Sequence, residues 1–215
     1  MKPENFIEVS FEVANKVGGI YQVLNSKSAR MKDFYGDSYI TVGRYDEDAV
    51  RDDFNPRKCI EEIEALHEKD LEGIEVHCGV WRISSQPACI LVDPSGLEKD
   101  IDEIKEEMYE EHGVDSLGVG EEFDEPVKWA YAVGKVISAL EEELEGETVV
   151  QLHEWLSGPA LMNFDSPSVF TTHATALGRA LSNSDYDLQD AVEEGEVDDI
   201  LADDYGVKAK HHVEK

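Results

Sequence analysis

The sequence predicts an α/β fold in which a mainly parallel sheet is covered by helices on both faces. Three observations support this prediction. Short apolar segments rich in β-branched residues alternate with helical patterns. A glycine pair, Gly18-Gly19, separates the first apolar segment from the first helical one, and two later apolar segments lead into His153 and His173. Ligands bind parallel sheets outside the carboxyl ends of the strands, so we expect the glycine pair and both histidines on one rim of the sheet.

The first part of the chain predicts a β-α-β unit. Residues 6–11 mix β-branched and aromatic side chains as a strand does, and the glycine pair then precedes a helix from residue 19 to about residue 31. A second strand is expected over 38–42, after Gly36, which suits the end of a helix.

The middle of the chain predicts two strands and three helices. The spacing of apolar residues indicates strands at 74–76 and 89–92 and helices over 59–68, 101–112 and 126–145. The third helix is expected to begin at Pro126, because proline is tolerated in a first turn.

The last part of the chain adds two compact apolar strands, over 148–153 and 168–173, each ending in a histidine. A short helix is expected between them, and residues 207–215 have helical character. Together these elements predict a single Rossmann-like domain spanning 1–215, incomplete at its C-terminal end.

The charge of the chain is its unusual feature. It carries 49 acidic and 19 basic residues, a formal net charge of −30, spread along most of the 215 residues. Such repulsion destabilises a compact fold in dilute buffer, whereas at molar salt the screening length falls to about 3 Å. We therefore expect a halophilic protein from a high-salt cytoplasm. The alternative is an acidic protein that binds or mimics polycations, although such charges usually come in blocks. Nucleic-acid binding is disfavoured, since it needs a basic face.

The sequence also disfavours a membrane-spanning protein, a disulfide-bonded protein and a metal-binding protein. No stretch approaches the roughly 18 apolar residues of a membrane span, and the first residues lack a signal-peptide pattern, so a cytoplasmic location is expected. The cysteines, Cys59, Cys78 and Cys89, have no Cys-x-x-Cys spacing and are expected to be reduced. No metal site is expected, because neither of the two pairs, His77-Cys78 and His211-His212, has a third ligand at suitable spacing.

Lys16, Gly18 and Gly19 lie between the first strand and the first helix, where glycines let the backbone approach a ligand and free amides point at an anion. The phosphate of a nucleotide fits such a turn. A tight turn also uses glycine for steric reasons alone, and that reading stays open. Neither G-x-G-x-x-G nor a Walker sequence is present, so nicotinamide dinucleotides and P-loop chemistry are disfavoured.

His153-Glu154 and Thr172-His173 each come near the end of a strand and offer hydrogen-bonding groups suited to sugar hydroxyls. A structural role is the competing interpretation for each histidine. A serine-hydrolase triad is unsupported because no G-x-S-x-G sequence occurs, and a metal-binding histidine pair lacks its carboxylate partner.

Three segments resemble glycogen synthase of the eukaryotic and archaeal type, and they occur in the same order. They are FEVANKVGGIYQVL at 11–24, HEWLSG at 153–158 and VFTTHATALGR at 169–179. The resemblance extends over nearly the whole chain and is faint across 45–72 and 95–122. It implies the N-terminal half of a two-domain GT-B enzyme that transfers glucose, with retention, from UDP-glucose or ADP-glucose to an α-1,4-glucan. It also implies that no metal or other cofactor is needed.

The resemblance also implies roles for individual residues. Catalytic roles are implied for His173, which would contact the donor glucose at the reacting centre, and for Arg179, which would lie close to the donor. Glu154 would serve the acceptor side of the cleft. Substrate-binding roles are implied for Lys16, Gly18, Gly19, His153, Glu154 and Thr172.

The chain departs from the family in one respect. The family's C-terminal domain, which holds the nucleotide base, phosphate-binding cations and an essential glutamate, has no counterpart in these residues. Positioning and electrostatic stabilisation supply most of a transferase's acceleration, so we expect negligible activity from this chain alone. The alternatives are a stand-alone, non-catalytic glucan-binding or regulatory module and a sucrose- or trehalose-type GT-B enzyme, which fits 171–175 less well. The nucleotide and a homo-oligomeric state are left open.

Overall fold

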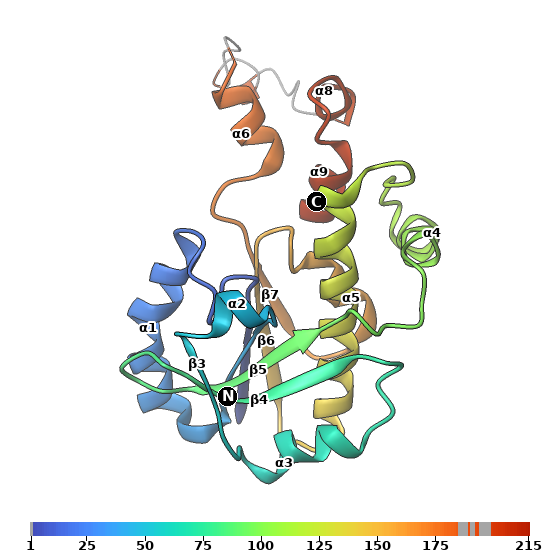
Figure 1. Ribbon diagram of the computed structural model, residues 1–215. Coiled ribbons are helices and arrows are strands. Elements are labelled where there is room, and N and C mark those ends of the chain that lie inside the picture. Colours follow the sequence, from blue (N-terminus) through green and yellow to red (C-terminus); the bar gives the residue numbers. More distant parts are fainter. Residues whose placement is uncertain (1, 185–188, 190–191, 194–198) are drawn as a thin grey trace.

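The computed structural model describes residues 2–184, 189, 192–193 and 199–215 (Figure 1). Its centre is one seven-stranded sheet with the order β3-β4-β5-β2-β1-β6-β7. The strands are β1 (Asn5–Val9), β2 (Tyr39–Arg44), β3 (Phe54–Pro56), β4 (Glu75–Trp81), β5 (Ala88–Asp93), β6 (Thr148–His153) and β7 (Ser168–Thr171). The five strands from β5 to β7 are parallel, whereas β4 runs antiparallel to both β3 and β5. The predicted α/β fold with a mainly parallel sheet is confirmed.

The expected β-α-β unit consists of β1, helix α1 (Ile20–Tyr35) and β2. The helix continues about one turn past the predicted end. It stops at Gly36, whose φ of 62° is easy for glycine and whose amide bonds to the Lys32 carbonyl. A 3₁₀ turn, η1 (Gly36–Ser38), then leads into β2.

The segment between β2 and β4 differs most from expectation. The continuous helix predicted over 59–68 is wrong, because α3 (Glu61–Glu64) passes into a 3₁₀ helix, η2 (Ala65–Glu68). Helix α2 (Glu47–Val50), capped by the Asp46 carboxylate, and strand β3 were not predicted. Strand β4 extends well beyond the expected residues 74–76, since it pairs with neighbours on both sides.

Helix α4 (Ile101–His112) has the predicted bounds and ends at Gly113, which adopts the left-handed conformation. Helix α5 (Glu121–Glu141) begins five residues before the predicted start at Pro126, so that prediction is wrong. The extra turn is stabilised because it buries Phe123 and places acidic side chains at the positive end of the helix. Pro126 therefore lies inside the helix. Because proline has no backbone N–H, the Glu122 carbonyl receives no helical hydrogen bond from residue 126.

The C-terminal part comprises η3 (Gly158–Asn163), α6 (Ala176–Ser182), α8 (Asp199–Asp204) and α9 (Lys208–Glu214). Helix α9 confirms the helical character predicted for 207–215. Figure 1 shows α6, α8 and α9 together beyond the end of the sheet where α5 begins. Leu177, Leu181 and Ala202 form a small apolar cluster that joins α6 to α8.

Apolar layers cover both faces of the sheet. On one face α5 packs against alternate residues of the central strands, and Trp129 is fully buried there. On the other face Tyr21 and Leu24 of α1 pack with Trp81 and Leu91. Burying a large apolar side chain stabilises a fold by about 1.5–3 kcal/mol, so these two layers fix the sheet that carries the candidate site.

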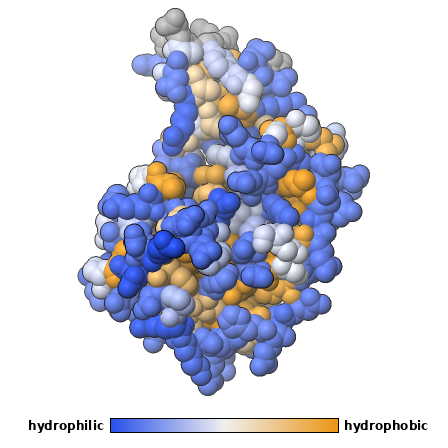
Figure 2. All heavy atoms as spheres, in the orientation of Figure 1, coloured by the Kyte–Doolittle hydropathy of each residue, from blue (hydrophilic) through white to orange (hydrophobic). Residues whose placement is uncertain are grey.

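The surface is strongly hydrophilic, and Figure 2 shows polar residues over most of the visible face with small apolar patches between them. Among the described residues, no helix combines the length and apolar character that crossing a membrane requires. Cys59, Cys78 and Cys89 are free thiols, as predicted. Burial raises the pKa of Cys78 to about 12, which keeps it protonated at neutral pH.

Candidate functional site

The candidate site lies where three parallel strands end side by side. Strand β1 pairs with β2 on one side and β6 on the other, and β6 pairs with β7. The connection after β1 leads to β2 on one side of it, whereas the later strand β6 lies on the opposite side of β1. Such a reversal of strand order is a topological switch point, where α/β sheets bind ligands. The connections that follow β1, β6 and β7 leave from the same edge of the sheet. This arrangement brings together the segments 10–19, 154–157 and 172–175, which we call the rim.

The two glycines of the rim have different surroundings. A Cβ atom added at Gly18 would lie 2.4 Å from Oε1 of Glu12, whereas a Cβ at Gly19 would meet nothing within 4 Å. The Glu12 carboxylate accepts a hydrogen bond from the Tyr21 amide at 2.8 Å, so it already occupies part of the N-terminus of α1. Gly18 thus makes room for an internal carboxylate, and Gly19 is the glycine whose backbone is open to a ligand.

Lys16 is exposed, and its ammonium lies 5.7 Å from the centroid of the Tyr21 ring. Within the described part of the chain no carboxylate is within ion-pair distance of it. Its charge is therefore available to an anion that approaches Gly19.

His153 ends β6 and is only 2% exposed. Its Nε2 lies 2.9 Å from Oε1 of Glu8, and its Nδ1 lies 3.3 Å from Nε2 of His173. The two imidazole rings are nearly parallel, with centroids 5.6 Å apart. The structure therefore brings the two predicted histidines into contact, with His153 beneath the surface and His173 exposed.

Glu8 is a part of the site that the sequence analysis missed. It is fully buried next to the last residue of β1, and besides His153 it contacts the Lys27 ammonium and the Tyr39 hydroxyl. Burial by itself would raise the pKa of Glu8, but the hydrogen bonds from His153, Lys27 and Tyr39 together outweigh it and hold the pKa below its ordinary value. The sequence signal was a glutamate inside an otherwise apolar strand.

Glu154 is also buried, at 5% exposure, and it holds the rim in place. Its carboxylate accepts a hydrogen bond from the His173 amide at 2.8 Å, and its own amide donates to the Thr171 carbonyl at 2.9 Å. Its φ of 66° is unusual for a residue with a side chain. The strain persists because the Ser157 hydroxyl also fixes this turn through the carbonyls of His153 and Glu154.

Thr172, His173 and Arg179 are all exposed. Arg179 lies on α6 and donates from Nε to the Ala174 carbonyl at 3.3 Å, which places its guanidinium beside the segment that contains His173. Helix α6 is held at its start by Glu214 of α9, whose two carboxylate oxygens each lie 2.9 Å from the Ala176 amide nitrogen. Two cations, Lys16 and Arg179, therefore flank the rim of a strongly acidic chain.

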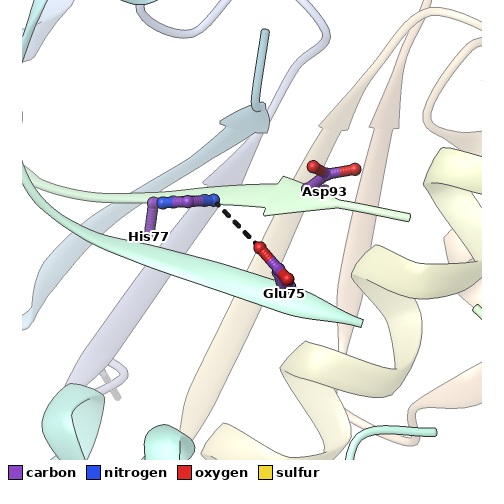
Figure 3. Close-up of side chains that lie close together, drawn as sticks. All are labelled: Glu75, His77 and Asp93. Atoms are coloured by element: carbon purple, nitrogen blue, oxygen red, sulfur yellow. Dashed lines mark ion pairs between the residues drawn. The ribbon is translucent and has the colours of Figure 1, made fainter. Parts of the chain in front are cut away.

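A separate group of potential metal ligands lies on β4 and β5, which β2 separates from β1 (Figure 3). Glu75, His77 and Asp93 offer ligand atoms that all lie within 4.8 Å of one another. Glu75 is opposite Asp93 in the strand pairing, its side chain is 73% exposed, and Asp93 accepts a hydrogen bond from the Ser95 amide. An exposed carboxylate and one already used in a turn are typical of a solvated strand end, so we propose no metal site here.

His77 belongs to the wall of a hollow of about 480 Å³ that Tyr45, Arg51 and His67 also line. Its ring stacks on Tyr45 at 3.6 Å between centroids, and burial lowers its pKa, so the imidazole is neutral at pH 7. This hollow lies on the β4 side of the sheet and shares no residue with the rim.

Comparison with known proteins gives a consistent result. The family model described as glycogen synthase matches residues 8–214. The liver glycogen [starch] synthase of Rattus norvegicus is 29% identical over 199 residues, which cover 89% of this chain and 28% of the relative. Glycogen [starch] synthase of Neurospora crassa is 30% identical over 92% of this chain and 29% of the relative. Isoform 2 of the Saccharomyces cerevisiae enzyme is 28% identical over 97% of this chain and 32% of the relative. The chain thus spans about 30% of the length of these relatives.

Proposed function

Because the chain belongs to the glycogen synthase family, we propose that it forms the acceptor-side half of a retaining glucosyltransferase. In this proposal glucose passes from a nucleotide sugar, UDP-glucose or ADP-glucose, to the end of an α-1,4-glucan. The observation that carries the proposal is the rim itself, where an exposed histidine, an open glycine backbone and two cations border the carboxyl ends of three adjacent strands.

Each exposed group of the rim has a role that its chemistry suits. His173 contacts the donor glucose, since an imidazole can both donate and accept hydrogen bonds with sugar hydroxyls. Gly19 and Lys16 face the diphosphate, because an open backbone and an ammonium without a carboxylate partner among the described residues both attract anions. Arg179 adds a second positive charge near the donor, and Thr172 adds a hydroxyl to the same surface. The proposed reaction needs no metal or other cofactor.

His153, Glu154 and Gly18 act indirectly in this proposal. His153 and Glu154 are buried and bond to the side chain and the backbone of His173 respectively. Gly18 admits the Glu12 carboxylate that caps α1. Their role is to hold the exposed groups in place, which is where much of the rate enhancement of a transferase originates.

We further propose that the base of the nucleotide and additional phosphate-binding cations come from a second domain outside these 215 residues. The relatives are more than three times as long as the part that this chain matches. One half of a cleft cannot exclude water or surround the developing charge of a transition state, so the chain alone should transfer no measurable glucose. The dense negative charge favours a high-salt cytoplasm as the setting.

Ligand titrations followed by nitrogen-15 backbone NMR test this function, because they detect weak binding. Millimolar UDP-glucose or ADP-glucose should shift amide signals of the rim, chiefly around Gly19 and His173, and leave those of β3 and β4 in place. The variant His173→Ala should weaken binding at least fivefold. The matched control His112→Ala, at an exposed histidine on α4, should not.

Two outcomes would contradict the proposal. Shifts centred on the hollow beside His77, with none on the rim, would remove the rim as the donor site. Binding of maltooligosaccharide by the isolated chain at micromolar concentration, without any response to a nucleotide sugar, would favour a non-catalytic glucan-binding module instead.

A further inference from the structure

Four side chains, three beneath the rim and His173 on it, form a continuous line of hydrogen bonds. The Tyr39 hydroxyl donates to Oε2 of Glu8, Oε1 of Glu8 lies 2.9 Å from Nε2 of His153, and Nδ1 of His153 lies 3.3 Å from Nε2 of His173. Only His173, at the outer end, is exposed. The line therefore connects a buried carboxylate on β1 to the imidazole that the rim presents.

The charges along this line identify the protonation state of His153. Glu8 is fully buried and ionised, and it contacts the Lys27 ammonium, so the pair is already neutral. Among the described residues, the other side chains that bond to this pair are uncharged, namely Tyr39 from β2 and Gln151, which accepts from Lys27 at 2.8 Å. The carboxylate of Glu154, the next residue along the chain, accepts from the backbone amide of His173. A proton added to the buried His153 would create a second positive charge beside a carboxylate that is already paired, which is unfavourable because a buried charge needs a partner. His153 is therefore neutral.

The hydrogen-bond pattern then assigns the tautomers of both rings. An ionised carboxylate can only accept, so the proton of neutral His153 lies on Nε2, which faces Glu8. The other nitrogen of a neutral imidazole is an acceptor, so Nδ1 of His153 accepts and Nε2 of His173 carries the proton that it donates. Nδ1 of His173 is left as a lone pair, and no described group bonds to it.

We propose that Glu8 is a positioning residue that acts through His153 to fix His173 in the tautomer protonated on Nε2, which presents Nδ1 to the rim as a hydrogen-bond acceptor. His173 would then select a ligand that offers a hydroxyl donor at this point. The identity of that ligand as a sugar rests on the proposed function, whereas the tautomer does not.

Removal of the Lys27 charge tests the proposal with a directional result. Lys27 lies on α1 with its side chain 29% exposed, so Lys27→Met should fold. Glu8 would then lack its cation, and a protonated His153 would take the place of Lys27 as the partner of the carboxylate. A doubly protonated His153 donates from Nδ1, so the proton of His173 must move from Nε2 to Nδ1. Long-range proton–nitrogen NMR spectra of histidine-labelled chain distinguish protonated from unprotonated ring nitrogens and should show this exchange.

Three further variants make the test specific. Lys27→Arg keeps the positive charge and should retain the wild-type tautomers. Tyr39→Phe removes a neutral partner of Glu8 and should also leave them unchanged. In the double variant Lys27→Met with Glu8→Gln the pair is neutral again, so the wild-type pattern at His153 and His173 should return.

Two results would overturn the proposal: an unprotonated Nε2 on His173 in the wild-type chain, or a Lys27→Met chain whose ring-nitrogen signals match the wild type. Addition of UDP-glucose to the same samples separates this proposal from the proposed function. Absence of any response to the sugar nucleotide would contradict the function and leave the tautomer assignment standing. A response to UDP-glucose in a chain whose His173 is not protonated on Nε2 would contradict the tautomer assignment and leave the proposed function standing.

Discussion

Gly18 and Gly19 are neighbours in sequence, yet a methyl group at each should have different effects. In Gly18→Ala the new Cβ would displace the Glu12 carboxylate, which lies 2.4 Å from that position and caps the Tyr21 amide. Loss of a helix cap costs about 0.5–2 kcal/mol, so we expect the free energy of unfolding to fall by roughly 1 kcal/mol. The midpoint of urea denaturation measures this change.

Gly19→Ala serves as the matched control, because its Cβ meets no atom and its φ of −79° suits any residue. Its stability should stay within about 0.5 kcal/mol of the wild type. Binding of a nucleotide sugar should be impaired by Gly19→Ala more than by Gly18→Ala, since only Gly19 has an open flank. Equal losses of stability in both variants would show that the Glu12 contact is not what requires glycine at position 18.

The buried Glu8 carboxylate should make stability depend on acidity in a defined direction. Its pKa is lowered in the folded chain, because the hydrogen bonds from His153, Lys27 and Tyr39 outweigh its burial. A carboxyl with a lowered folded pKa stabilises the fold above its unfolded pKa of about 4.3, and this stabilisation is lost as the pH falls through the folded value. The stability difference between wild type and Glu8→Gln should therefore shrink as the pH falls from 6 to 3.

Urea midpoints of the two chains across that pH range measure the effect. Other acidic groups, including Glu214, whose pKa is raised by burial, titrate in both chains and cancel in the difference. A difference that is independent of pH would mean that Glu8 is not ionised in the fold.

At the scale of single elements, the sequence predicted β1, α1, β2, β5, α4 and β6 well, because each has an apolar pattern of its own and a clear end signal such as Gly36 or Gly113. Strand β3 and the far half of β4 were missed, since they depend on pairing with neighbouring strands and contain Pro56 and Gly79. The start of α5 was misplaced because proline is usually an N-terminal signal, whereas here burial of Phe123 adds a turn before it.

The sequence also predicted the candidate site only in part, since it identified the two histidines but not Glu8 or Lys27. His153 ends β6 and His173 comes two residues after β7, so both were found by position, but their contact depends on β6 and β7 being neighbours. Glu8 stood out only as a charge in an apolar strand, and in a strand buried on both faces such a charge is a signal of function. Its partner Lys27 lies on α1, and no local pattern links the two.

The packing of α5 against η3 gives a prediction at this scale. A Cβ at Gly134 would lie 2.5 Å from the Ala160 carbonyl oxygen and 2.8 Å from Cβ of Asn163. Alanine favours a helix by up to about 1 kcal/mol over glycine, but forcing backbone apart costs about 1–3 kcal/mol, so Gly134→Ala should destabilise the fold by roughly 1–2 kcal/mol. Thermal unfolding followed by circular dichroism measures this.

Ser138→Ala, one turn further along α5 and only partly buried, is the control and should be neutral or slightly stabilising. A Gly134→Ala chain as stable as Ser138→Ala would mean that η3 can move away from α5 without loss.

At the scale of the whole molecule, 49 acidic groups against 19 basic ones set the dependence on salt. Long-range repulsion acts over about 30 Å at 0.01 M salt and about 3 Å at 1 M, so it nearly vanishes in molar KCl. Short ion pairs in buried or partly buried positions, such as Glu8 with Lys27, are screened far less. Added salt should therefore remove the unfavourable charge interactions while leaving the contacts beneath the rim intact.

We expect the melting temperature to rise by at least about 10 °C between dilute buffer and 2 M KCl, which corresponds to roughly 3–5 kcal/mol for a chain of this size. Sucrose at equal osmolarity is the control, because it favours burial by exclusion without screening charge. It should give a much smaller rise. If KCl and sucrose act equally, or if neither acts, charge repulsion is not what limits this fold, and the halophilic proposal fails.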